Sequence, residues 1–252
     1  MIKKFSNSDE LAKYLANEIL EYLQKKNKCV LGCPGGRSLT KTYYQLGQIS
    51  HKKKISLENL TIIMMDEYVL KRKNTFSLVD PKSHFSCVRF SNQVIKRLLN
   101  YKKRKSYKIT NERILFPNVL DPAKYDYQIK NMGGIDIFLL ASGSSDGHVA
   151  FNNNHSKINQ NTHIIKLTKE TRRDNMKTFP NFKSIKEVPK YGITVGLNTI
   201  ATLSKSATLV LTGNEKKYAF SMTTQNGRFN NKWPASIIYK CKKYRIFTDN
   251  LS

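Results

Sequence analysis

An apolar run from Ile135 to Ala141, interrupted only by Asp136, places the strongest constraint on how this chain can fold. Such a run is typical of a strand that is buried on both faces of a parallel sheet. The run ends in a turn rich in Ser and Gly that leads to Asp146 and His148. In open α/β sheets, ligands bind just beyond the carboxyl ends of the strands, so this turn is a candidate reactive site. The plain alternative is a connecting turn with a capping Asp and a surface His.

Strands and helices alternate along the chain. Asn7 followed by Glu10 has the pattern of a helix cap, and Asp121-Pro122 that of another helix start. We expect strands over residues 28–32, 60–65, 113–116, 135–141, 163–168, 192–195, 207–211 and 244–248. We expect helices that begin after Asn7 and near residues 38, 83, 121, 171, 198 and 215. This alternation predicts an α/β fold with a mostly parallel sheet and helices on both faces. No linker or repeat divides the chain, so residues 1–252 are expected to form a single domain.

The composition limits the classes of protein to be considered. Hydrophobic residues make up 39% of the 252 residues, and no apolar run approaches the ~20 residues of a membrane span. The N-terminal residues lack the apolar core of a secretory signal. The four cysteines form no Cys-x-x-Cys pair and no zinc-ligand spacing, which is typical of reduced thiols in a cytoplasmic protein. We therefore expect a cytoplasmic protein without a membrane partner.

The charge is strongly positive, with 44 Lys and Arg against 18 Asp and Glu and a net charge of +26. Such an excess can indicate nucleic acid, an anionic surface or anionic small molecules as partners. The one dense basic run is Lys102 to Lys105, and other lysines are scattered among Asn, Tyr and Ile. No helix-turn-helix, zinc-finger or aromatic RNA-binding motif accompanies them. We interpret most of the excess as compositional and expect no nucleic-acid partner.

Four of the expected strands are followed by reactive or anion-binding residues. Gly35-Gly36-Arg37-Ser38 is a glycine turn before a helix, where backbone N–H groups and the helix dipole can bind an anion. Asp66-Glu67 offers a base and a second acid, or two charges of a first helical turn. Asp146 and His148 follow the strand expected over residues 135–141. Gly213 to Lys216 follow the strand expected over residues 207–211 and form a second turn before a helix. The carboxyl ends of parallel strands meet along one edge, so these four segments are expected to share one crevice.

In this order, the segments resemble the glucosamine-6-phosphate deaminase/isomerase and 6-phosphogluconolactonase family over nearly the whole chain. The resemblance rests on Leu31-Gly-Cys-Pro-Gly-Gly-Arg-Ser38, Met65-Asp-Glu-Tyr-Val69, Gly133-Gly-Ile-Asp136, Gly143 to Asn152, Thr171-Arg172, Val188 to Gly196 and Thr212 to Lys217. The segments around Asp66 and His148 look like the deaminase branch, because lactonases usually continue differently after Asp-Gly-His.

The resemblance implies a Rossmann-like domain with no metal and no organic cofactor, a sugar phosphate as ligand and possible homo-oligomers. Asp66 falls where deaminases place the base that moves the C2 proton of the opened sugar. An Asp has a reference pKa of about 3.9, so Asp66 is expected to be ionised at neutral pH. By the same resemblance, His148 falls at the ring-opening residue. An imidazole with a reference pKa of about 6.5 suits proton shuttling. Asp146 falls at the acid that orients this histidine. The implied substrate-binding residues are Gly35, Gly36, Arg37, Ser38, Glu67, Ala150, Asn153, Lys177 and Lys216.

Three positions depart from the family pattern. Deaminases carry a Glu five residues after the histidine, where this chain has Asn153, which can orient an imidazole but cannot exchange a proton. Arg37 stands where a small residue is usual, and Lys177 replaces an arginine, which exchanges a bidentate fork for a point charge.

Three functions therefore stay open. The first is an isomerase or deaminase that acts on a hexose or hexosamine 6-phosphate. The second is a lactone hydrolase in which His148 activates water, although Phe151-Asn152 after the motif speaks against it. The third is a sugar-phosphate-binding protein without catalysis.

Overall fold

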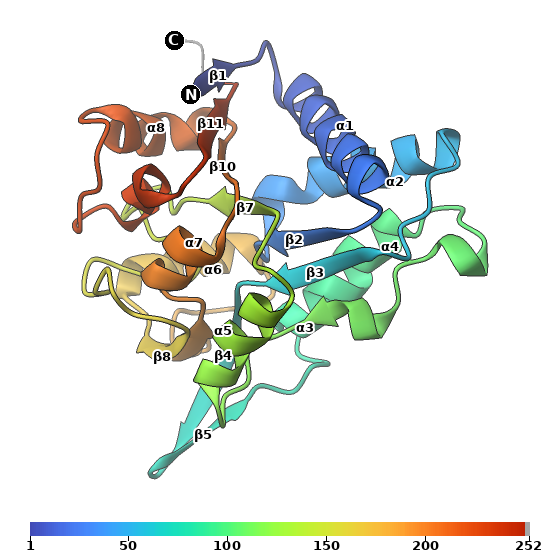
Figure 1. The fold of residues 1–252 in the computed structure, drawn as a ribbon. Helices are drawn as coiled ribbons and strands as arrows, with labels where there is room; N and C mark the ends of the chain where they lie inside the picture. Colours follow the sequence, from blue (N-terminus) through green and yellow to red (C-terminus); the bar gives the residue numbers. More distant parts are fainter. Residues whose placement is uncertain (250–252) are drawn as a thin grey trace.

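A seven-stranded parallel sheet forms the centre of the computed structural model, which describes residues 1–249 (Figure 1). The strand order is β1-β11-β10-β7-β2-β3-β6, and every neighbouring pair is parallel. The strands are β1 (Ile2–Lys4), β2 (Cys29–Cys33), β3 (Leu60–Met64), β6 (Ile114–Leu115), β7 (Ile137–Ala141), β10 (Ala207–Leu211) and β11 (Tyr244–Thr248). The predicted α/β fold with a mostly parallel sheet is confirmed, and β1 is a strand that the sequence reading missed.

A second, antiparallel sheet lies beside the parallel one and was not predicted from the sequence. It has the order β5-β4-β9-β8 and consists of β4 (Asp66–Arg72), β5 (Thr75–Leu78), β8 (His163–Lys166) and β9 (Tyr191–Thr194). The physical reason lies at Met65, the single residue between β3 and β4. The chain leaves the parallel sheet there without a crossover helix, and the Met65 carbonyl accepts a hydrogen bond from Val195 at 2.8 Å. This contact brings β9 beside β4 rather than into the parallel sheet.

Helices connect the strands in the predicted order. The α-helices are α1 (Ser8–Lys26), α2 (Thr40–Lys52), α3 (Cys87–Phe90), α4 (Arg97–Leu99), α5 (Pro122–Asn131), α6 (Lys169–Thr178), α7 (Leu197–Leu203) and α8 (Lys217–Thr224). The 3₁₀ turns are η1 (Arg37–Leu39), η3 (Lys105–Tyr107), η4 (Asn111–Arg113), η5 (Asn214–Lys216) and η6 (Pro234–Lys240), and η2 (Ser91–Lys96) is a π-helix. The predicted caps are confirmed, since Asn7 accepts from the N–H groups of Asp9 and Glu10, and Asp121 accepts from that of Lys124. The helix expected from residue 83 begins at Cys87 instead, with Ser86 as its cap.

Two apolar clusters lie on the two faces of the parallel sheet. One joins α1 and α2 to the sheet through side chains such as Leu15 and Leu139. The other joins α7 and η6 to the opposite face through Phe138 and Ile237. Successive side chains of a strand point to opposite faces, so Phe138 and Leu139 contribute to different clusters. Both faces are therefore covered by helices, as predicted.

The helices and the cysteines were the subject of two further expectations from the sequence. Within residues 1–249, no helix combines the length and the apolar character that crossing a membrane requires. The four cysteines are all buried, free thiols.

Candidate active site

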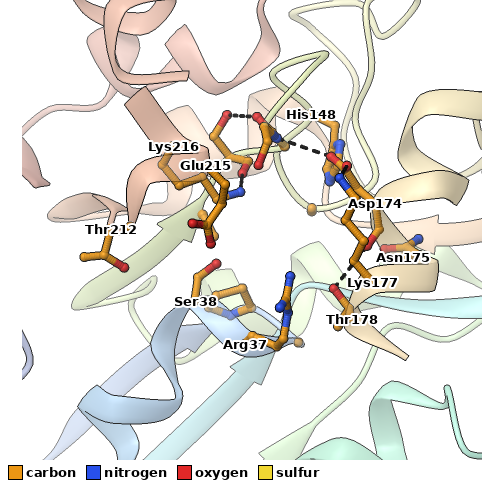
Figure 2. Close-up of a pocket in the computed structure, with 18 of the residues that line it drawn as sticks. Arg37, Ser38, His148, Asp174, Asn175, Lys177, Thr178, Thr212, Glu215 and Lys216 are labelled. Carbon is orange, nitrogen blue, oxygen red and sulfur yellow. Dashed lines mark hydrogen bonds and ion pairs between the residues drawn. The ribbon is translucent and has the colours of Figure 1, made fainter. Parts of the chain in front are cut away.

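A cavity of about 600 Å³ lies where the four strand ends noted in the sequence meet (Figure 2). Arg37 follows β2, Asp66 follows β3, His148 follows β7 and Lys216 follows β10, and all four line this cavity. Helix α6 closes another side with Asp174 and its neighbours. The expected convergence of the four segments on one crevice is therefore present in the structure.

The His148 ring is held by Asp146 at one wall of the cavity. Its Nδ1 lies 2.7 Å from Asp146 Oδ1, which also accepts the His148 backbone N–H at 3.1 Å. Asp146 Oδ2 accepts a hydrogen bond from the Thr171 hydroxyl at 3.0 Å. Burial works to raise the pKa of Asp146, but the hydrogen bonds from His148 and Thr171 outweigh it and hold this pKa well below its usual range. Asp146 is absent from the cavity lining and lies behind His148, as an orienting acid would.

Gly143 permits the close approach of these two side chains. A Cβ at this position would lie 2.2 Å from His148 Nδ1 and 2.4 Å from Asp146 Oδ1. The Gly143 N–H donates to the His148 carbonyl at 2.7 Å, so the turn folds back on itself. Any other residue at 143 would therefore displace the acid–imidazole pair.

Asp66 is the first residue of β4 and lines the cavity with only 7% of its surface exposed. Burial, with a smaller contribution from the charge of Glu67, raises the pKa of Asp66 to about 7, although the hydrogen bond from the Cys87 thiol acts to lower it. That thiol donates to Asp66 Oδ1 at 3.4 Å. The prediction of an ordinary, fully ionised Asp is therefore wrong, because burial disfavours the charged form.

Glu67 does not reach the cavity, which corrects its prediction as a substrate-binding residue. Only 1% of the surface of Glu67 is exposed. It accepts hydrogen bonds from the Ser86 hydroxyl and from the backbone N–H groups of Tyr68, Cys87 and Val88 at 2.7–3.0 Å. Glu67 therefore fastens β4 to the start of α3, and it places Cys87 beside Asp66.

The glycine turn after β2 forms the floor of the cavity. Gly35, Arg37 and Ser38 line it, whereas Gly36 is buried outside the lining. Gly36 has φ +102, a conformation that favours glycine. The helix predicted to open at Ser38 instead begins at Thr40, after the 3₁₀ turn η1. Figure 2 shows Arg37 and Ser38 facing the open centre.

The two predicted phosphate cations differ in their settings. Lys216 donates to the Ser142 carbonyl, and burial lowers the pKa of Lys216 although Asp174 and Glu215 oppose this effect. The Lys177 side chain is 70% exposed, and its Nζ lies 3.9 Å from Asp174 Oδ1. Both residues line the cavity, Lys216 in its wall and Lys177 at the solvent side.

Two predicted substrate-binding residues remain. Ala150 lines the cavity, and Asn153 does not. Ala150 has φ +50, a left-handed conformation that is rare for a residue with a side chain. Asn153 is buried, and its amide donates to the Lys166 carbonyl at 3.2 Å and accepts from the His155 N–H at 3.0 Å. The amide of Asn153 thus has a partner at each end, and the predicted contact of Asn153 with substrate stays a prediction.

Like Cys87, which contacts Asp66, Asp174 lines the cavity without having been predicted from the sequence. It lies in the middle of α6, a polar helix, and looks like an ordinary surface acid in the sequence. The one available signal was its position three residues after Thr171, since residues i and i+3 share a helix face. In the structure, its Oδ2 accepts the Ser144 N–H at 3.2 Å, and the side chain faces the cavity.

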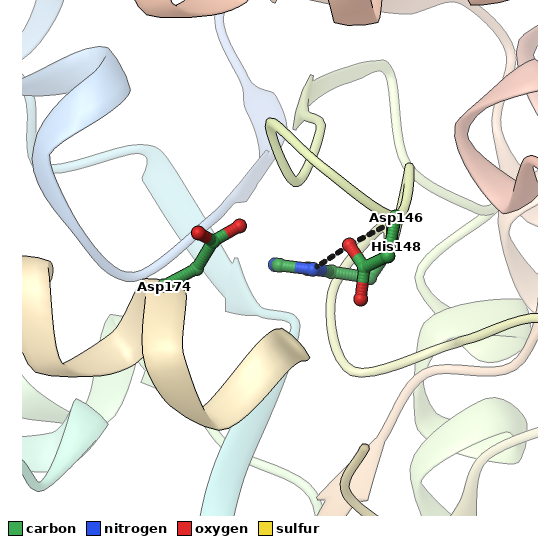
Figure 3. Close-up of side chains that lie close together, drawn as sticks. All are labelled: Asp146, His148 and Asp174. Carbon is green, nitrogen blue, oxygen red and sulfur yellow. Dashed lines mark hydrogen bonds and ion pairs between the residues drawn. The ribbon is translucent and has the colours of Figure 1, made fainter. Parts of the chain in front are cut away.

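Asp146, His148 and Asp174 each offer one atom within 4.8 Å of the others (Figure 3), which is close enough to consider a metal ion. Several of these possible ligand atoms already have hydrogen-bond partners, however. Both Asp146 oxygens accept hydrogen bonds, Nδ1 of His148 is bound to one of them, and Lys216 lies nearby as a positive charge. This arrangement favours proton transfer over cation binding.

Comparison with known proteins adds to this geometry. The model of the family described as glucosamine-6-phosphate isomerases/6-phosphogluconolactonase matches residues 4–247. The chain belongs to this family. A glucosamine-6-phosphate isomerase of Candida albicans is 31% identical over 98% of this chain and 94% of its own length.

Solved structures of both branches of the family share the fold. A monomeric glucosamine-6-phosphate deaminase superimposes with a TM-score of 0.82 at 25% identity, over 99% of this chain and 97% of its own. The 6-phosphogluconolactonase of Thermotoga maritima reaches a TM-score of 0.68 at 16% identity, over 98% and 97% of the two chains. The second likeness concerns the fold alone.

Proposed function

We propose that this protein is a sugar-phosphate isomerase/deaminase that acts on a hexosamine 6-phosphate. The observation that carries the proposal is that Asp66 and His148 line one cavity together with the basic residues Arg37 and Lys216. One wall thus offers a base, another an imidazole, and the floor offers donors for an anion. The names of the relatives in the deaminase branch support the same substrate class.

The phosphate would bind between the glycine turn and Lys216. Gly35, Arg37 and Ser38 line this part of the cavity. Helix α2 begins just beyond, so its dipole adds to the attraction of an anion. Lys216 would exchange its bond to the Ser142 carbonyl for a charge-assisted bond to phosphate.

Ring opening would use His148. The imidazole takes the proton of the hydroxyl at C1 and returns a proton to the ring oxygen, while the bond from C1 to that oxygen breaks and C1 becomes a carbonyl carbon. Asp146 supports this step because it fixes the ring through Nδ1 and stays charged, its pKa being held well below the usual range by its hydrogen bonds.

Proton transfer between the sugar carbons would use Asp66. The carboxylate removes the C2 proton of the opened sugar and delivers it to C1, while the C1 carbonyl oxygen gains a proton and the amino group loses one. A 2-amino aldose thereby becomes a ketose imine, which water converts to ketose and ammonia. Burial raises the pKa of Asp66 to about 7, so the group can both accept and release a proton near neutral pH.

These steps require acid–base groups alone, so the proposal includes no metal and no organic cofactor. We place the reaction in the cytoplasm, in keeping with the four free thiols.

A panel of sugar phosphates tests the proposal. Glucosamine 6-phosphate, glucose 6-phosphate and 6-phosphogluconolactone are each incubated with the protein, and ammonia, ketose and acid release are measured separately. We expect ammonia and fructose 6-phosphate from the amino sugar. Lactone hydrolysis without ammonia would make the protein a lactonase, and tight binding without turnover of any sugar would make it a sugar-phosphate-binding protein.

A further inference from the structure

His148 lies between two carboxylates that come from different parts of the chain. Asp146, from the same turn, binds Nδ1 at 2.7 Å. Asp174, from α6, places a carboxylate oxygen within 4.8 Å of both the imidazole and Asp146. Figure 3 shows the ring extending from the Asp146 turn toward Asp174. The sequence predicted Asp146 alone as an acid partner of His148, and the structure therefore adds a second acid beside the imidazole.

Helix α6 positions both carboxylates. Thr171 in its first turn donates to Asp146 Oδ2 at 3.0 Å, and Asp174 follows on the same face. Asp174 is also tied to the histidine turn, because its Oδ2 accepts the Ser144 N–H at 3.2 Å. Only 18% of its side chain is exposed, so its charge is poorly screened by water.

The segment after His148 supplies no such charge. Asn153, where deaminases carry a Glu, uses its amide for the Lys166 carbonyl and the His155 N–H. A carboxylate beside the imidazole beyond Asp146 therefore has to come from another element, and α6 provides it.

We propose that Asp174 is a positioning residue for catalysis, which acts through His148 by stabilising its protonated ring. During ring opening, His148 carries one proton between two oxygens of the sugar and is transiently an imidazolium. A carboxylate at the open side of the ring lowers the free energy of that cation, and no proton or electron is consumed overall. The catalytic part of this inference rests on the proposed function, whereas the effect on the ring's charge does not.

Other charged residues near the His148 imidazole also affect the stability of its protonated form. Asp66 on β4 interacts with His148, and Lys216 on η5 interacts with Asp174 and Asp146. Lys177 lies near Asp174 from the solvent side. Without Asp174, the imidazole would lose one of its anions while the lysines remain, so its protonated form would become less stable.

The variant Asp174→Asn tests the inference, because it keeps the shape and an acceptor for Ser144 but removes the charge. Glu170→Gln is the matched control, since it removes one exposed carboxylate of the same helix outside the cavity lining. The titration of the His148 ring is followed by NMR, with its signal assigned by its loss in His148→Gln. We expect the midpoint in Asp174→Asn to fall by about half a pH unit or more, with no change in Glu170→Gln.

Turnover gives the second readout. We expect kcat on glucosamine 6-phosphate to fall about tenfold or more in Asp174→Asn, with KM changed less than about threefold, and Asp174→Glu to restore part of the rate. Asp174→Ser replaces the Asn variant if that variant does not fold. A His148 midpoint equal to that of the control overturns the inference, whatever the activity. A parent without turnover would contradict the proposed function instead, and the NMR titration would still decide the role of Asp174.

Discussion

At the scale of single residues, the two acids Asp66 and Asp146 are held in opposite states. Burial raises the pKa of Asp66 to about 7, and its partner is a thiol. Asp146 is also buried, yet hydrogen bonds from His148 and Thr171 hold its pKa well below the usual range. Environments that push two carboxyl pKa values apart are typical of acid–base sites. Asp66 can therefore exchange a proton near neutral pH, while Asp146 keeps its charge.

Cys87 contributes to the pH dependence expected of the site, because it lowers the pKa of Asp66. Its thiol donates to Asp66 and lowers the pKa of that carboxyl, so Cys87→Ala raises it. The base form of Asp66 exists above its pKa, so we expect the activity of the parent to rise as pH passes through about 7. We expect this acid limb of the kcat/KM profile to move to higher pH in Cys87→Ala. Cys241→Ala, which removes another buried thiol, is the control and should leave the limb in place. An unmoved limb in Cys87→Ala would assign it to a group other than Asp66.

At the scale of elements, the strands with apolar runs were the easiest to read from the sequence. The runs at 135–141 and 207–211 became β7 and β10 because burial on both faces leaves a mostly apolar pattern. Strand β4 carries Lys71 and Arg72 at its exposed end, so it lacked such a pattern and was missed. Asp174 was missed for a related reason, since its role comes from contacts with a turn 30 positions away in sequence, at Ser144.

The junction between β4 and α3 depends on Glu67. Its carboxylate accepts four hydrogen bonds in a buried setting, and an amide cannot accept all four. Glu67→Gln is therefore expected to lower the free energy of unfolding by about 1–3 kcal/mol, measured by urea denaturation. The exposed Glu58→Gln serves as control and should change it by less than about 0.5 kcal/mol. Full stability combined with weakened substrate binding in Glu67→Gln would restore Glu67 as a ligand residue.

At the scale of the whole molecule, two sheets and helix α6 surround one cavity. The parallel sheet contributes its strand ends, and the antiparallel sheet begins at Asp66. The net charge of +26 extends over the whole chain, whereas the cavity mixes both signs. Arg37 and Lys216 line it together with Asp66 and Asp174. Recognition of a phosphate therefore depends on where cations are placed, more than on the total charge.

Lys216 is the cation that this arrangement makes most important for binding. It is half-buried in the cavity wall, whereas Lys177 is largely exposed and screened by water. We expect Lys216→Ala to weaken binding of glucosamine 6-phosphate about tenfold or more, and Lys177→Ala to have a smaller effect, both measured by calorimetry. Binding of unphosphorylated glucosamine should not change. Equal affinity of the parent for the two sugars would contradict a phosphate site here.

The most direct measurement of the central claim is solvent deuterium exchange at the sugar carbons. The parent and Asp66→Asn are incubated with glucosamine 6-phosphate and with fructose 6-phosphate in D₂O, and label at C2 and C1 is followed by NMR. The amide keeps the shape of the side chain but cannot take a proton. We expect the parent to exchange these positions and Asp66→Asn to lose exchange by a factor of about 100 or more, with substrate affinity within a few-fold. Exchange in Asp66→Asn at the parent rate would contradict the account, because the carboxylate that the fold buries in the cavity would then not be the base.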